Sequence, residues 1–229
     1  PGLANKLCIP SAAKICCNFP EAMEHLPKGK AVLTGTPIRQ ELFHGNPLDA
    51  IQFTGLQANK PTILVIGGST GSVRVNEAVR ECLDELLKTY QIIHLCGKGK
   101  LDIAYEHRDG YVQYEYIKKE LSSLLALADI VISRAGANAI CELLALKKPT
   151  LLIPLSAKAS RGDQILNARS FERQGFSMVL EEEELTTESL LHAVSELNAH
   201  RADYIHAMEA SPQSDAIGKI LQLLEEVTA

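Results

Sequence analysis

The chain has 229 residues, of which 46% are apolar and 22% are charged, a composition typical of a globular protein. Its formal net charge of −5 excludes a general attraction to nucleic acid or anionic lipid, so we expect no nucleic-acid partner. No apolar run reaches the roughly 18 to 20 residues that a membrane-spanning helix requires.

The first 36 residues differ in pattern from the rest of the chain. A helix is predicted over residues 7–19, followed by the breakers Pro20 and Pro27-Lys-Gly29, and a strand is predicted over residues 31–33. This stretch resembles the end of an upstream domain and a linker. Because the chain opens at Pro1 rather than at Met, we expect it to be the C-terminal part of a longer protein.

From residue 60 onward, short apolar runs alternate with amphipathic segments. The runs predict buried strands at residues 62–66, 91–95, 111–114, 130–133, 150–153 and 177–180. Helices are predicted between them at residues 73–88, 119–128, 139–146 and 164–174. This alternation indicates an α/β fold, a Rossmann-like doubly wound parallel sheet with helices on both faces.

After residue 180 the pattern is helical, with helices predicted at residues 187–197, 201–210 and 215–226. The four acids of residues 181–184 are expected to form a solvated turn before the first of these helices. We therefore assign residues 1–36 to a domain remnant and linker, residues 37–212 to the Rossmann-like domain and residues 213–229 to a C-terminal helix.

Two glycine-rich turns follow the first two strands of this domain. In Ile66-Gly-Gly-Ser-Thr-Gly71, the glycines allow the backbone to approach a ligand, and the next helix offers unpaired N–H groups to a pyrophosphate. An ordinary structural turn explains this segment equally well. For Gly97-Lys-Gly-Lys100, a turn with solvated lysines is favoured over an anion site.

A third polar loop, Ser133-Arg-Ala-Gly-Ala-Asn138, precedes a predicted helix that carries Glu142. Glu142 lies one helical turn past Asn138, so its carboxylate can accept hydrogen bonds from the two hydroxyls of a ribose. A structural ion pair between Arg134 and Glu142 is the alternative.

A fourth polar loop, residues 156–168, contains Asp163 and Gln164, whose side chains suit sugar hydroxyls. Capping of the following helix by Asp163 is the competing explanation. Ligands of open α/β sheets bind at the carboxyl ends of the strands, so the four loops together predict a nucleotide site.

The remaining reactive side chains predict neither a metal site nor a nucleophile. The six cysteines lack zinc-site spacing and are expected to be buried, reduced thiols. The seven histidines form no HExxH or HxH motif, and His94, inside a predicted strand, is expected to be a hydrogen-bonded core residue. We therefore expect no metal and no cofactor, and no residue is a convincing general base.

Five blocks of sequence together resemble the MurG family of glycosyltransferases. They are Pro1-Gly-Leu-Ala-Asn5, Thr34-Gly-Thr-Pro-Ile-Arg39, Gly67-Gly-Ser-Thr-Gly71, Ser133-Arg-Ala-Gly-Ala-Asn138 with Glu142, and Arg161-Gly-Asp-Gln164 with Asn167-Ala168. The resemblance extends from Pro1 to near the C-terminus, and the last two blocks are its most specific parts. It implies a GT-B architecture, in which two Rossmann-like domains face each other, with this chain supplying the C-terminal one.

The resemblance also implies a function. Members of the family are inverting transferases that move N-acetylglucosamine from UDP-N-acetylglucosamine to lipid-linked N-acetylmuramyl-pentapeptide, converting lipid I to lipid II in peptidoglycan synthesis. This chain would be the donor-binding half and transfer poorly alone, with the acceptor site, the membrane contact and the general base in the N-terminal domain. The full-length protein is expected in the cytoplasm, peripheral on the inner face of the cell membrane.

Transferred residue by residue, the resemblance assigns the diphosphate to the glycine loop and the start of the helix after Gly136. Ile117 would read the uracil, Glu142 would bind the ribose, and Gln164 with Asp163 would bind the sugar. The expected substrate-binding residues are Arg39, Gly68, Ser69, Gly71, Ile117, Gly136, Ala137, Asn138, Ala139, Glu142, Asp163 and Gln164. A non-catalytic nucleotide-sugar-binding module and a UDP-sugar epimerase are the alternative functions.

Overall fold

The structure is a computed structural model that describes residues 2–68, 70–159, 162–211, 213 and 216–228. The chain divides into two compact units, Pro1–Ile38 with Glu209–Ala229, and Arg39–Met208. None of the described helices is long and apolar enough to cross a bilayer. The functional division at residues 36 and 212 stays a prediction.

The first unit contains α1 (Leu3–Cys8), β1 (Ile15–Cys17), α2 (Pro20–Met23), β2 (Ala31–Leu33) and α11 (Ala216–Thr228). Strands β1 and β2 pair in parallel, with Ile15 opposite Ala31. The strand predicted at residues 31–33 is confirmed, whereas the helix predicted over residues 7–19 is wrong. Pro10 has no N–H with which to continue a helix, and the β-branched Ile15 belongs to a strand instead.

The second unit holds the predicted alternation of strands and helices. In chain order its elements are η1 (Gln40–His44), α3 (Pro47–Thr54), β3 (Thr62–Ile66), α4 (Val73–Glu81), α5 (Leu83–Thr89), β4 (Gln91–Leu95), η2 (Ile103–Tyr105), β5 (Tyr111–Tyr114), α6 (Leu121–Leu127), β6 (Ile130–Ser133), α7 (Ala137–Ala145), β7 (Thr150–Leu152), α8 (Asp163–Arg173), β8 (Met178–Val179), η3 (Glu182–Glu184), α9 (Thr187–Ala199) and α10 (Arg201–Glu209).

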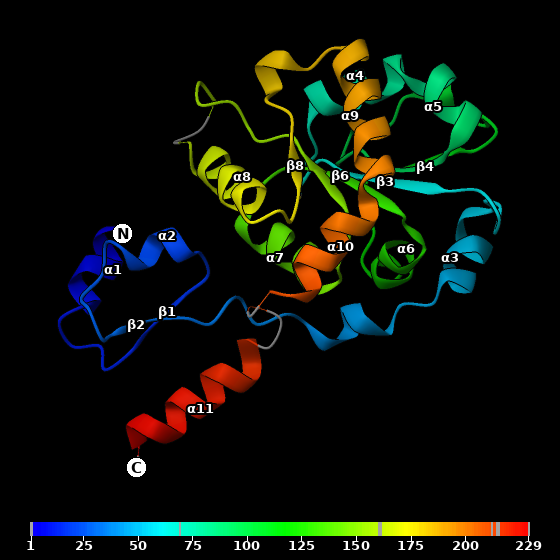
Figure 1. Ribbon diagram of the computed structural model, residues 1–229. Helices are drawn as coiled ribbons and strands as arrows, with labels where there is room; N and C mark the ends of the chain where they lie inside the picture. Colours follow the sequence, from blue (N-terminus) through cyan, green and yellow to red (C-terminus); the bar gives the residue numbers. More distant parts are fainter. Residues whose placement is uncertain (1, 69, 160–161, 212, 214–215, 229) are drawn as a thin grey trace. The chain divides into compact units, whose positions relative to one another are not determined.

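The six strands of this unit form one sheet in the order β5-β4-β3-β6-β7-β8, and every neighbouring pair is parallel (Figure 1). Along the chain the sheet grows outward from β3 in one direction as far as β5, and then from β6 in the other. The direction reverses between β3 and β6. This is the predicted doubly wound, Rossmann-like topology, and such a reversal is where ligands of these folds bind.

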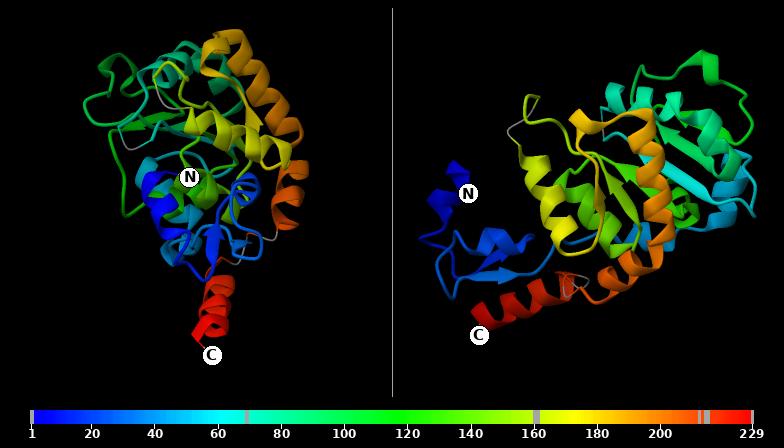
Figure 2. Two further views of the ribbon diagram at one scale, coloured as in Figure 1. Left: turned by 90° about the vertical axis from the view of Figure 1, so that its left-hand side faces the viewer. Right: turned by 45° about the horizontal axis from the view of Figure 1, so that its top comes forward.

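Both faces of the sheet are covered, which explains the continuous apolar runs in its central strands. Every residue of β4 is buried, and alternate residues of each strand point to opposite faces. One face, which includes Ile63 and Val65, packs against α4, α5 and α9, while α6 and α7 lie on the other side (Figure 1). Figure 2 shows this layered arrangement from two further directions.

His94 confirms the expectation of a hydrogen-bonded core histidine. It is fully buried in β4, with Nδ1 2.9 Å from the Tyr111 hydroxyl and Nε2 3.0 Å from Asn76 Oδ1. Burial, with Arg80 as a second cause, lowers the pKa of His94 to about 3. The cysteines fit their expectation only in part, because Cys8 and Cys16 are exposed.

Two local differences separate the helices from the prediction. The helix predicted over residues 73–88 is divided at Cys82 into α4 and α5. Helix α3 was not predicted, although its caps are readable in the sequence. The Asn46 side chain accepts from the Leu48 N–H, Pro47 occupies the first turn, and Gly55 ends the helix with a φ of 73°.

Candidate functional site

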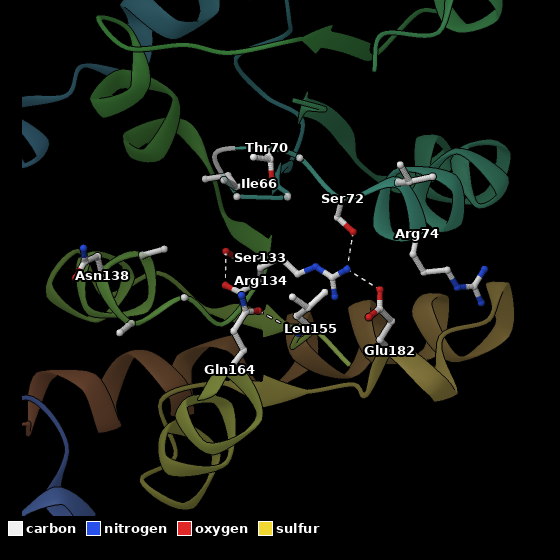
Figure 3. Close-up of a pocket in the computed structure, with 17 residues that line it drawn as sticks. Ile66, Thr70, Ser72, Arg74, Ser133, Arg134, Asn138, Leu155, Gln164 and Glu182 are labelled. Atoms are coloured by element: carbon white, nitrogen blue, oxygen red, sulfur yellow. Dashed lines mark hydrogen bonds and ion pairs between the residues drawn. The ribbon is translucent and has the colours of Figure 1, made fainter. Parts of the chain in front are cut away.

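Two adjoining cavities open at the carboxyl ends of β3 and β6, where the strand order reverses. The first has a volume of about 710 Å³ and the second about 550 Å³. They share the lining residues Ile66, Gly68, Ser133 and Ala139. Three of the four predicted loops therefore contribute residues to these cavities, whereas the turn Gly97-Lys-Gly-Lys100 lines neither. Figure 3 shows the first cavity.

The expected substrate-binding residues divide between these cavities. The first is lined by Gly68, Gly71, Gly136, Ala137, Asn138, Ala139 and Gln164. The second is lined by Arg39, Gly68, Ile117, Ala139 and Glu142. Asp163 is exposed and lines neither cavity, and Ser69 lies outside the described residues.

The N-terminus of α7 is open toward the first cavity. Its N-cap is Gly136, which has no side chain to accept a hydrogen bond from the first turn. The first backbone N–H groups of a helix have no partner within the helix, and they carry the positive end of its dipole. Ala137, Asn138 and Ala139 line the cavity at this end. The arrangement suits a bound anion.

The N-terminus of α4, in contrast, is already capped. Ser72 Oγ accepts from the Val75 N–H at 3.3 Å and from the Arg134 guanidinium at 2.6 Å. Of the helix N-termini beside the first cavity, α4 therefore has a side-chain cap, whereas α7 and α8 begin after a glycine and have none.

The alternative ion pair between Arg134 and Glu142 is wrong. The buried Arg134 donates at 2.6 Å to Glu182 (Figure 3). It also donates to the carbonyls of Ile153 and Pro154 at 3.1 Å each. These bonds connect the ends of β6 and β7 to η3, so Arg134 holds the floor of the first cavity together.

Glu182 belongs to the acidic run that was predicted to be a solvated turn. Instead, its side chain is only 15% exposed, and its Oε2 accepts from the Ser156 N–H at 3.0 Å. The Ser156 hydroxyl donates to Glu183 at 2.5 Å, and this hydrogen bond lowers the pKa of Glu183. No short-range pattern could have revealed the pairing of Glu182, because its partner lies 48 residues away.

Glu142 points toward the second cavity and pairs with Arg39. Its Oε1 accepts from Arg39 Nη2 at 3.0 Å and from Nε at 3.3 Å, and its side chain is 25% exposed. Arg39 is half exposed, so this pair lies in contact with solvent and contributes little to stability. The carboxylate is therefore accessible to another hydrogen-bond donor.

Gln164 is oriented by one backbone contact. Its Oε1 accepts from the Leu155 N–H at 3.0 Å, which leaves its amide NH2 as a donor at the first cavity (Figure 3). No described residue accepts from this NH2 group. The N-cap of α8 is Gly162, so the competing explanation of helix capping by Asp163 is wrong.

The apolar wall of the second cavity was not foreseen. Leu95, Leu121 and Leu125 line it beside Ile117, which is 6% exposed. The spacing of apolar residues in the sequence predicts that such leucines are buried in the core, but it does not indicate that they border a cavity. In the described part of the chain, no group of three or more His, Cys, Asp or Glu side chains could hold a metal ion.

Comparison with known proteins agrees with this geometry. The sequence matches the glycosyltransferase family 28 C-terminal domain over residues 62–223. The chain belongs to this family. The matched range covers all six strands of the sheet and extends into α11.

The chain is also similar to curated proteins over nearly its whole length. It is 64% identical to a UDP-N-acetylglucosamine--N-acetylmuramyl-(pentapeptide) pyrophosphoryl-undecaprenol N-acetylglucosamine transferase of Lachnoclostridium phytofermentans, over 99% of this chain and 64% of that protein. The chain thus spans less than two thirds of this curated relative.

Two solved structures share the fold of this family 28 chain. MurG of Acinetobacter baumannii is 20% identical with a TM-score of 0.67, covering 99% of this chain and 64% of that one. A UDP-GlcNAc 2-epimerase of Neisseria meningitidis, solved bound to UDP-GlcNAc, is 14% identical with the same TM-score and the same coverage. At these identities the similarity establishes the fold alone, and it confirms the expected GT-B class.

Proposed function

We propose that this chain carries the donor-binding part of an enzyme that transfers N-acetylglucosamine from UDP-N-acetylglucosamine to a lipid-linked N-acetylmuramyl-pentapeptide. The observation that carries the proposal is the order of the expected contacts. Ile117 and Glu142 line the second cavity, Gly68 and Ala139 lie at the junction, and Gln164 lines the first cavity. Uridine, diphosphate and hexosamine follow one another in that order in the donor.

The chemistry assigned to these residues is binding and leaving-group stabilisation. A hydroxyl of the acceptor sugar attacks the anomeric carbon, the bond from that carbon to the phosphate oxygen breaks, and UDP leaves. The open N–H groups of α7 and the backbone around Gly68 stabilise the charge that develops on UDP. Each donor of this kind is worth about 3 kcal/mol in the transition state. We assign the general base that accepts the hydroxyl proton to no residue of this chain.

A lipid-linked acceptor places the full-length enzyme at a membrane surface. We propose a cytoplasmic protein that associates with the inner face of the cell membrane through residues outside this chain. The donor contacts need only residues 39–208, so the chain itself is expected to bind the donor and to transfer poorly or not at all.

Calorimetric titration of the 229-residue chain tests the proposal. We expect tighter binding of UDP-N-acetylglucosamine than of UDP-glucose, at one site per chain. Glu142→Gln should weaken binding about tenfold or more, because a charged hydrogen bond to ribose contributes about 1.5 to 3 kcal/mol. Glu106→Gln, which removes the same charge from an exposed residue that lines neither cavity, is the matched control and should bind like the wild type.

Two results would reject the proposed function. One is the absence of any UDP-N-acetylglucosamine binding by a folded chain, and the other is wild-type affinity in the Glu142 variant. The alternative functions separate in other assays. A non-catalytic module predicts that Glu142→Ala leaves transfer intact in the full-length protein, and an epimerase predicts that donor alone is converted to its epimer.

A further inference from the structure

The turn Gly97-Lys-Gly-Lys100 holds two lysines in very different surroundings. Lys98 is exposed and forms no hydrogen bond or ion pair with a described residue, as expected for a solvated turn. Lys100, in contrast, donates from Nζ to the carbonyl oxygen of Thr70 at 2.5 Å. Thr70 belongs to the glycine loop of residues 67–71 and lines the first cavity, whereas Lys100 lines neither cavity.

The two glycine turns also meet backbone to backbone. A Cβ added to Gly71 would lie 1.9 Å from the Cys96 carbonyl oxygen, and one added to Gly97 would lie 2.5 Å from the Thr70 carbonyl oxygen. Both glycines have positive φ, 69° and 92°. Neither position can accept a side chain without moving the backbone, so the second turn supports the first. Asn76 on α4 reinforces the contact by donating to the Cys96 carbonyl at 2.9 Å.

The peptide group between Thr70 and Gly71 is held from both sides. Its N–H, which belongs to Gly71, donates to the Gly68 carbonyl at 3.0 Å, and its carbonyl accepts from Lys100. A carbonyl oxygen carries partial negative charge, so a rotated peptide would present that oxygen to an anion bound beside the loop. The Lys100 contact holds this carbonyl toward the second turn.

The second turn is itself anchored beside the second cavity. The Gly97 N–H donates to the Glu115 carbonyl at 3.0 Å, and the Gly99 N–H donates to Glu115 Oε1 at 2.6 Å. Glu115 lines the second cavity, and the Lys100 carbonyl accepts from Arg80 at 2.7 Å. The turn therefore connects the glycine loop of the first cavity to the segment before Ile117 in the second.

We propose that Lys100 is a positioning residue for the donor's diphosphate, acting through the Thr70 carbonyl to fix the Thr70–Gly71 peptide group in its binding conformation. This inference rests on the proposed function. Lys100 does not touch the donor, and Lys98 has no part in binding. The role is specific to the phosphates, because Lys100 contacts the glycine loop and none of the residues assigned to the uracil or ribose.

The test compares Lys100→Met with Lys98→Met, which removes the same charge from the same turn. Affinities for UDP, UDP-N-acetylglucosamine and uridine are measured by titration calorimetry and, for uridine, by NMR. In Lys100→Met we expect about a tenfold loss for UDP and UDP-N-acetylglucosamine, because a charged hydrogen bond is removed, and less than a twofold change for uridine. Lys98→Met should change none of the three by more than about twofold, since exposed charges interact weakly through water. Lys100→Arg keeps a charged donor and should recover most of the affinity.

The outcomes are distinguishable. A wild-type chain that binds neither UDP nor its sugar conjugate rejects the proposed function. The inference on Lys100 is overturned, while the proposed function stands, if the wild type binds but Lys100→Met has the same affinities as Lys98→Met. Equal losses of affinity for uridine and for UDP in Lys100→Met overturn it too. Thermal unfolding checks that each variant folds. If Lys100→Met does not fold, Lys100→Gln, which has a neutral donor in place of the charged one, is measured instead.

Discussion

At the scale of single residues, the sequence located the polar groups better than their partners. Glu142 lies on α7 beside the second cavity and Gln164 beside the first, as expected from the loops that carry them. The ion pair between Arg134 and Glu142, the alternative to ribose binding, is wrong. In the folded chain, β7 and η3 bring Glu182 to Arg134 instead, and such tertiary pairings leave no local pattern.

Gln164 gives a residue-scale prediction about the sugar. Gln164→Glu keeps an oxygen to accept from the Leu155 N–H but replaces the NH2 donor at the cavity with a second acceptor. We expect some loss of affinity for UDP, because the added carboxylate repels the diphosphate, and a loss about tenfold greater for UDP-N-acetylglucosamine, because one hydrogen bond is also replaced by an unsatisfied acceptor. Both are measured by titration calorimetry.

The matched control for this change is Gln52→Glu, at an exposed position of α3 that lines neither cavity. It adds the same charge and should bind both ligands like the wild type. Equal losses of UDP and UDP-N-acetylglucosamine in Gln164→Glu would contradict the placement of the sugar in the first cavity.

At the scale of elements, the sequence predicted those strands and helices that leave a regular spacing of apolar residues. All six strands of the sheet were located, and the inner ones are short, continuous apolar runs because they are buried on both faces. Helix α3 was missed, since its caps were not weighed, and the helix predicted over residues 7–19 was wrong because pairing with β2 recruits residues 15–17 into a strand. Pairing between distant segments outweighs local helix propensity there.

Strand β4 carries a prediction about pH through His94. The pKa of His94 falls from its ordinary value of 6.5 to about 3 on folding. Between these values the unfolded chain binds a proton that the folded chain does not, so the free energy of unfolding decreases as the pH falls below about 6.5. This one group is expected to remove about 2 kcal/mol of stability between pH 7 and pH 5.

Urea unfolding at pH 7, 6 and 5 measures this loss in the wild type and in His94→Gln. The variant is less stable at every pH because its hydrogen bonds to Tyr111 and Asn76 are disturbed. Its stability should nevertheless fall less steeply toward pH 5 than that of the wild type. Parallel pH dependences in the two proteins would show that His94 does not carry the effect.

At the scale of the whole molecule, the account depends on two cavities acting as one site. They lie at the reversal of strand order, share four lining residues and are lined entirely by the unit Arg39–Met208. The doubly wound topology was predictable from the alternation of elements. The sizes of the cavities and their division were not, because they depend on how side chains from many loops and helices pack together.

The most direct test is a crystal structure of the chain with UDP-N-acetylglucosamine. We predict uracil beside Ile117, ribose hydroxyls bound to a Glu142 that has exchanged Arg39 for the ligand, diphosphate at the N-terminus of α7, and the hexosamine beside Gln164. A donor bound in the reverse direction, or bound elsewhere while Glu142 remains paired with Arg39, would contradict the account.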